Sequence, residues 1–228
     1  MRTAYHEDLR RISDQLVEMT RLAGSAMSRA STALLDADVR LAETVITADH
    51  EIDANREALD NLAIDLLARQ NPVATDLRTV VTAMRMSADL ERMGDLARHV
   101  AKVARLRYPD SAVPAELRGT IVQMSQVASR IVAKAGSVIA SRDLAEAASL
   151  ERDDDAMDDL HRELFARLAD PDFNHGTQTA VDLTLVGRYY ERFADHAVSV
   201  ARRVTFLVTG DYDTVVDRED EEDAVLTS

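Results

Sequence analysis

Apolar and acidic positions separate onto opposite sides of a helical projection in two stretches of this chain. In the first stretch Glu91 and Asp95 lie about 40° apart at 100° per residue, away from the apolar side. The apolar side is formed by Leu90, Met93, Ala97 and Val100. Glu191 and Asp195 are separated in the same way from Tyr190, Phe193, Ala197 and Val200. Both stretches are therefore predicted to be amphipathic helices.

Breaks in the pattern are few and short. Asn71-Pro72, Pro109 with Pro114, and Asp170-Pro171 end helical stretches, because proline pushes the preceding residue out of the α region. The segments 36–38 and 141–143 are polar interruptions. Six helices are predicted, over residues 3–36, 38–70, 74–106, 115–141, 143–169 and 177–209. Long rods joined by short loops are typical of helical bundles.

The two halves of the chain repeat the same polar residues at nearly constant offsets. Asp49 and Asp53 fall on Asp154 and Asp158 at an offset of 105. At an offset of 100, the E-R-x-x-D-x-A sequence of residues 91–97 falls on residues 191–197. Because a fixed offset indicates a duplicated unit, we predict an all-α fold of two tandem three-helix bundles. The first unit spans residues 1–107, the second residues 115–210, and an acidic disordered tail residues 211–228.

Charge and composition exclude several classes of function. Residues 211–228 hold eight acidic residues and one basic residue, a net charge of −7 that is half of the total of −14. The remaining −7 opposes direct binding of nucleic acid or anionic lipid. The chain has no cysteine, and the sequence has no signal segment and no apolar stretch of membrane-spanning length. We expect a cytoplasmic protein that reaches the membrane only through partners.

The repeated carboxylates are candidate metal ligands. Their i,i+4 spacing places like charges together, which opposes helix formation by about 0.2–0.5 kcal/mol unless a cation reverses the effect. Four carboxylates could converge on the surface of each unit and bind a divalent or trivalent ion such as iron, manganese, zinc or magnesium. The candidate ligands are Asp49, Asp53, Glu91 and Asp95 in the first unit, and Asp154, Asp158, Glu191 and Asp195 in the second.

Other interpretations of these acids stay open. They are equally consistent with surface positions paired with Arg56, Arg92, Arg98 or Arg192. A di-iron enzyme would need Glu-x-x-His elements, and the sequence contains none. No phosphate-binding loop or catalytic triad is present either, so we expect no enzymatic activity. A metal-storage protein or a purely structural helical module remains an alternative.

At the two E-R-x-x-D motifs the sequence resembles the PhoU family of phosphate-uptake regulators. The resemblance covers about residues 1–210, including the D-x-x-x-D pair on the second helix of each unit. It implies two three-helix bundles side by side, a homodimer, and metal clusters held by the eight acids named above. It also implies negative regulation of phosphate uptake, with the protein acting between a Pst-type phosphate ABC transporter and a sensor histidine kinase. The acidic tail is not part of the family pattern.

Overall fold

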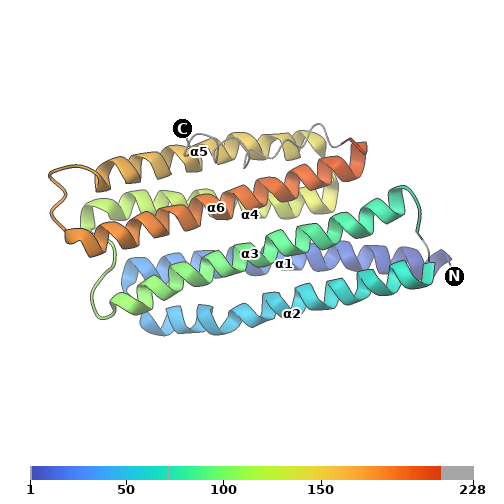
Figure 1. The fold of residues 1–228 in the computed structure, drawn as a ribbon, viewed down its shortest axis with the longest axis horizontal. Helices are drawn as coiled ribbons and strands as arrows, with labels where there is room; N and C mark the ends of the chain where they lie inside the picture. The colour runs from blue at the N-terminus through green and yellow to red at the C-terminus, as the bar shows by residue number, and fades with distance from the viewer. Residues whose placement is uncertain (1, 71, 212–228) are drawn as a thin grey trace, which may run out of the picture.

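The computed structural model describes residues 2–70 and 72–211, and the regular elements that it contains over them are all helices (Figure 1). The helices are α1 (Arg2–Asp36), α2 (Val39–Gln70), α3 (Thr75–Arg107), the short 3₁₀ helix η1 (Ala115–Leu117), α4 (Arg118–Ser141), α5 (Leu144–Leu168) and α6 (Gly176–Thr209). The all-α fold with six long helices is confirmed. The predicted ends agree to within one residue except at α4, whose first turn is the separate η1 because Leu117 N–H donates to Pro114 O at 3.0 Å.

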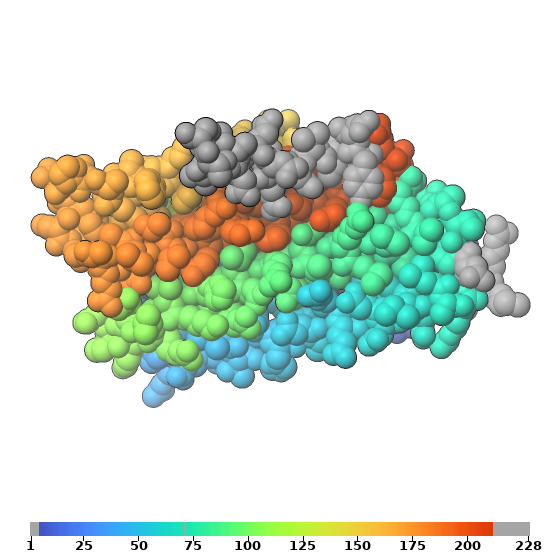
Figure 2. All heavy atoms as spheres, viewed as in Figure 1, coloured from blue at the N-terminus to red at the C-terminus, as the bar shows by residue number. Residues whose placement is uncertain are grey.

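The helices form two three-helix groups that pack side by side. Helices α1, α2 and α3 contact one another, as do α4, α5 and α6. Between the groups, α1 packs against α4 and α3 packs against α6, so α2 and α5 lie on the outer edges (Figure 1). The helices α3 and α6 run next to each other along the middle of one face (Figure 2). Of the predicted tail, only Asp211 lies within the described residues.

Local signals in the sequence set the helix ends. Asp143 begins α5 by accepting hydrogen bonds from the backbone N–H groups of Ala145 and Glu146. Gly210 ends α6 in the left-handed conformation, at φ 81°, and its N–H donates to Phe206 O at 2.8 Å. The breaks at residues 36–38 and 141–143 join α1 to α2 and α4 to α5, and the helices of each pair pack against each other.

One continuous core joins the two groups. Leu16, Met19, Leu90 and Met93 are fully buried in the first group, and each such side chain contributes about 1.5–3 kcal/mol by burial. Equivalent positions of the second group are filled by Ile121, Met124, Tyr190 and Phe193. Ser31 on α1 and Tyr190 on α6 share a buried hydrogen bond of 2.5 Å, which ties the groups together inside the core.

Close approach of α1 to α4 depends on glycine. A Cβ atom at Gly24 would lie 2.9 Å from Val132 Cγ1, and one at Gly136 would lie 2.7 Å from Thr20 Oγ1. Any larger residue at either position would push the two groups apart. Over residues 2–70 and 72–211, no helix is long and apolar enough to cross a membrane.

Candidate functional site

The first acidic cluster lies along the seam between α2 and α3. Asp49 on α2 is only 7% exposed, and Gly94 on α3 lets the two helices approach beside it. A Cβ atom at Gly94 would lie 2.7 Å from Ile52 Cδ1 and 3.4 Å from Asp49 Oδ1. The glycine inside the E-R-x-x-D motif therefore has a packing role: it keeps Asp49 close to the carboxylates of α3.

Arginines hold the carboxylates of this first cluster. Arg98 donates to both Asp49 and Asp95, and so joins α2 to α3. Arg92 Nη1 lies 3.0 Å from the other Asp95 oxygen. Arg56 Nη1 lies 3.1 Å from Glu91 Oε2, but this oxygen accepts no hydrogen bond and is shielded from solvent. Three arginines thus offset most of the charge of the four acids in the first cluster.

At Asp49, burial nevertheless has a larger effect on the pKa than the nearby arginine does. Desolvation raises the pKa of Asp49 above its ordinary value, even though the Arg98 charge acts in the opposite direction. The negative charges of Asp53, Asp95 and Glu91 raise the pKa further. Asp53 itself is exposed, and it acts on Asp49 through its charge. A cation at this seam would relieve the repulsion among these acids.

The second acidic cluster lies along the seam between α5 and α6. Glu191 is 6% exposed and Asp154 is 8% exposed, so both carboxylates are buried at the helix seam. Burial raises the pKa of Glu191 to about 7, with a further rise caused by the Asp195 and Asp158 charges and a decrease caused by Arg188. Arg188 donates to Oε1 of Glu191, whereas Oε2 is buried and accepts no hydrogen bond.

The two clusters differ because two of the three arginines of the first cluster, Arg56 and Arg98, are not duplicated. At the offset of 100, Arg98 falls on Val198, which is buried and apolar. At the offset of 105, Arg56 falls on His161, which lies beside Gly187. The α5–α6 cluster therefore repeats the carboxylates of the α2–α3 cluster, and Arg92 as Arg192, but has no arginine at the positions of Arg56 and Arg98.

Two expectations about these acids need correction. The helical projection placed them on the surface, but Asp49, Asp154 and Glu191 are buried where two helices meet. The projection considered each helix alone and could not show which side a neighbouring helix covers. The sequence analysis also missed Arg188 as a partner of Glu191. Its position one turn before Glu191 is a signal that could have identified it.

The histidines near the motifs contact residues outside the two acidic clusters. His196 Nδ1 lies 3.3 Å from Asp89 Oδ1, and Arg203 Nε lies 2.7 Å from the other Asp89 oxygen, so this group links α3 to α6. His99 packs against the Tyr189 ring, with centroids 5.2 Å apart. Burial lowers the pKa of His99, and the charges of nearby Lys102 and Arg98 lower it further.

Carboxylate oxygens are suitable ligands for a hard metal ion, but the present arrangement of these side chains does not form a metal site. Within the described ranges, no group of three or more histidine and carboxylate side chains is arranged to hold a metal. The buried oxygens Glu91 Oε2 and Glu191 Oε2, which accept no hydrogen bond, are in contrast the kind of donor that a cation would satisfy. The donor set therefore fits an oxygen-preferring ion, provided that the arginines turn away.

Comparison with known proteins identifies clear relatives. The PhoU domain family model matches residues 16–104 and again residues 121–204. The chain is 54% identical to the phosphate-specific transport system accessory protein PhoU homolog 2 of Mycobacterium tuberculosis, over 92% of this chain and 99% of the relative. It is 48% identical to PhoU homolog 1 of the same species, over 97% and 98%.

Solved structures agree with these relatives. The crystal structure of PhoU from Pseudomonas aeruginosa superposes with a TM-score of 0.81 at 26% identity, covering 91% of this chain and all of that one. The crystal structure of the phosphate transport system regulatory protein PhoU from Streptococcus pneumoniae gives a TM-score of 0.83 at 25% identity, covering 93% and 99%.

Proposed function

This chain belongs to the PhoU family of accessory and regulatory proteins of phosphate transport, and we propose that it is a negative regulator of phosphate uptake and of the phosphate-starvation response. In this proposal it is a cytoplasmic adaptor that associates with a Pst-type phosphate ABC transporter and with a sensor histidine kinase. When phosphate is plentiful, it holds the kinase in its phosphatase-favouring state. It reaches the membrane through these partners, and it works as a homodimer.

The observation that carries the proposal is the duplicated acidic motif in tandem three-helix groups across the whole folded region. Long helices present extended faces, and such faces suit the docking of another helical protein. An adaptor changes signalling only if it binds the two states of the kinase with different affinities. The family membership and the long helical faces therefore favour a binding function over a catalytic one.

Metal binding forms the second part of the proposal. Glu91, Asp95, Asp49 and Asp53 would hold an ion in the first unit, and Glu191, Asp195, Asp154 and Asp158 would hold one in the second. A bound ion would supply positive charge that stabilises the crowded carboxylates and joins the helices of each seam. The buried glutamate oxygens that accept no hydrogen bond support this assignment in both units.

Binding to the kinase tests the adaptor role. We expect the chain to bind the histidine kinase at least about tenfold more tightly in its phosphatase-favouring state than in its kinase-favouring state, a difference of about 1.4 kcal/mol. Titration calorimetry with kinase variants locked in each state measures this ratio. Equal affinities for the two states would contradict the adaptor role.

Metal content tests the second part separately. After extensive dialysis, elemental analysis should find iron, manganese, zinc or magnesium in the wild-type chain, and less in the Asp95→Ala, Asp195→Ala double variant. The same metal content in both proteins would refute the metal assignment while leaving the adaptor role intact. Turnover or iron loading that depends on Glu91 and Glu191 would instead favour a metal-dependent enzyme or a storage protein.

A further inference from the structure

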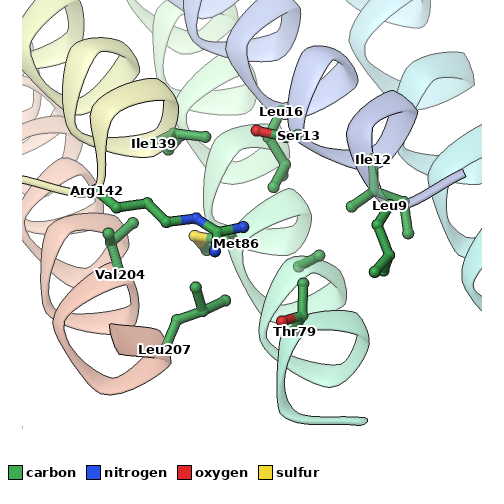
Figure 3. A pocket seen from close by; sticks show the side chains of 11 residues that line it. Leu9, Ile12, Ser13, Leu16, Thr79, Met86, Ile139, Arg142, Val204 and Leu207 are labelled. Atoms are coloured by element: carbon green, nitrogen blue, oxygen red, sulfur yellow. The ribbon is translucent and has the colours of Figure 1, made fainter. Parts of the chain in front are cut away.

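The cavity where both three-helix groups meet is too small to bind a ligand. Its walls come from α1, α3, α4 and α6, and include Ile12, Met86 and Leu207 (Figure 3). Its volume of about 20 Å³ is enough for about one water molecule. This cavity therefore provides no ligand site, in contrast to the outer face that α3 and α6 form together (Figure 2).

Exposed apolar side chains gather on this face, where the end of α3 lies beside the start of α6. Arg107 Nη2 donates to Asp182 Oδ1 at 2.9 Å across the seam between the two helices. Because the helices run antiparallel here, the preceding residues, Leu106 and Val181, are both rotated by 100° from the seam toward the same side. Leu106 is 68% exposed, Val181 53%, and Leu185, one turn further along α6, 43%. A cluster of large exposed apolar side chains, unlike a single one, indicates a site of interaction.

The same two helix segments are positively charged. Residues 99–107 and 181–192 contain five basic residues and two acidic ones, a net charge of +3 in a chain whose total is −14. The two acidic residues, Asp182 and Glu191, already accept hydrogen bonds from arginines of these segments. The surface around the apolar cluster is therefore basic, although the chain as a whole is acidic.

The apolar and basic side chains follow one another along both helices. On α6, residues spaced by four, three and four positions share one side, and they are Val181, Leu185, Arg188 and Arg192. On α3, Lys102 lies one turn before Leu106. Burial lowers the pKa of His99 and the Lys102 charge lowers it further, so Lys102 lies near His99, which packs against α6. A partner helix lying along this surface would therefore meet apolar side chains first and positive charge one to two turns later.

We propose that an acidic amphipathic helix of the sensor histidine kinase docks on this α3–α6 surface, defined by Leu106, Val181, Leu185, Lys102 and Arg192. The proposal rests on the adaptor function proposed above and names the surface that performs it. Amphipathic helices are bound through apolar residues one turn apart, which is the spacing of Val181 and Leu185. Acidic residues on the next turns of such a helix would complement Lys102 and Arg192, and so speed its association.

The charge of the α3–α6 surface favours this partner over two other occupants. A second copy of the chain would pack by twofold symmetry and bring the same basic residues against one another. An anionic membrane would attract this surface but would repel the rest of the chain, whose net charge is −14. A single acidic helix meets only the basic surface.

Calorimetric titration of the full chain with the cytoplasmic part of the kinase tests the apolar contact. Leu106→Ser with Val181→Ser should weaken binding at least about tenfold, because both side chains would lose their buried contacts with the partner. Both are exposed in the chain itself, so their replacement removes no packing from its core. Ile64→Ser with Phe165→Ser is the matched control, since these apolar side chains are similarly exposed on α2 and α5, and it should leave binding unchanged.

Reversal of one charge tests the electrostatic contact. Lys102→Glu should slow association with the kinase at least about threefold and make it less sensitive to salt, because a charge beside the contact mainly changes the association rate. Arg130→Glu, at an exposed arginine on α4, should change neither. Stopped-flow measurements at low and high salt give both quantities.

The outcomes separate this proposal from the adaptor role itself. Kinase binding that is unchanged in Leu106→Ser with Val181→Ser and in Lys102→Glu would overturn the docking surface and leave the adaptor role intact. A wild-type chain that does not bind the kinase would contradict both. Variants that bind the kinase normally but lose self-association would overturn the proposal in favour of a second copy, and variants that lose only binding to phosphatidylglycerol vesicles would overturn it in favour of a lipid surface.

Discussion

Arg98 donates hydrogen bonds to Asp49 across the α2–α3 seam and to Asp95 on its own helix. It thereby lies between two carboxylates that the duplicated motif assigns to a metal. Its counterpart in the second unit is Val198, which has no charge to offer. The two acidic clusters should therefore differ in how readily they accept a cation.

The second unit is expected to hold the larger share of any bound metal. In the second unit Arg188, whose side chain is about half exposed, pairs with Glu191, whereas in the first unit Arg98 joins Asp49 to Asp95 and has the apolar Val198 as its counterpart. We expect Glu191→Gln with Asp195→Asn to lower the metal content more than Glu91→Gln with Asp95→Asn. Elemental analysis of both double variants measures the difference. A greater loss from the first-unit variant would reverse the assignment.

Stability should fall as the pH rises through neutrality, because of Glu191. Its pKa is about 7 in the folded chain against an ordinary value of 4.5, so the protonated carboxyl stabilises the fold fully below pH 4.5, and this contribution is lost as the pH rises through 7. The loss amounts to at most about 3 kcal/mol. Urea unfolding with a chelator at about pH 5 and about pH 8 should show a smaller change for Glu191→Gln than for the wild type. Equal changes would show that Glu191 ionises normally.

Gly94→Ala should destabilise the chain, although alanine is the better helix former. The added Cβ would lie 2.7 Å from Ile52 Cδ1 and would push α2 away from α3 beside Asp49, at a cost of about 1–3 kcal/mol. Gly119→Ala is the matched control, because a Cβ there meets nothing within 4 Å, and we expect it to stabilise by about 0.5–1 kcal/mol. Denaturant midpoints measure both effects. Similar shifts in the two variants would exclude the close contact.

The hydrogen bond between Ser31 and Tyr190 should respond unequally to removal of each partner. Ser31→Ala leaves the buried Tyr190 hydroxyl without its partner, at a cost of about 1–3 kcal/mol. Tyr190→Phe should cost only about 0.5–1.5 kcal/mol, because the Ser31 hydroxyl keeps its bond of 2.7 Å to Met27 O. Unfolding free energies of both variants measure the difference. A larger loss in Tyr190→Phe would contradict this account.

Much of the fold could be predicted because its signals are local. Prolines, the Asp143 cap and the Gly210 terminus lie within a few residues of the helix ends that they set. The internal repeat then indicated two three-helix units. The pairing of α1 with α4 and of α3 with α6 could not be predicted, because it depends on contacts such as those at Gly24 and Gly136, where residues far apart in sequence meet.

The acids themselves were identified from the sequence, but their surroundings were not. A repeated motif gives residue types and spacing, whereas burial of Glu191 and Asp49 depends on the neighbouring helix. The unequal arginines of the two clusters follow from positions outside the repeated motif. The metal assignment of all eight acids, the extents of the units and the acidic tail after Asp211 remain predictions.

Expression of the phosphate-uptake genes in phosphate-rich medium tests the central claim most directly. Cells lacking this chain, and also lacking any second copy of the family, are compared with the same cells supplied with the wild-type gene. The regulatory role predicts that these genes are expressed despite abundant phosphate in the deletion strain, and that the wild-type gene restores repression. Unchanged expression in the strain without any copy would contradict negative regulation of phosphate uptake by this protein.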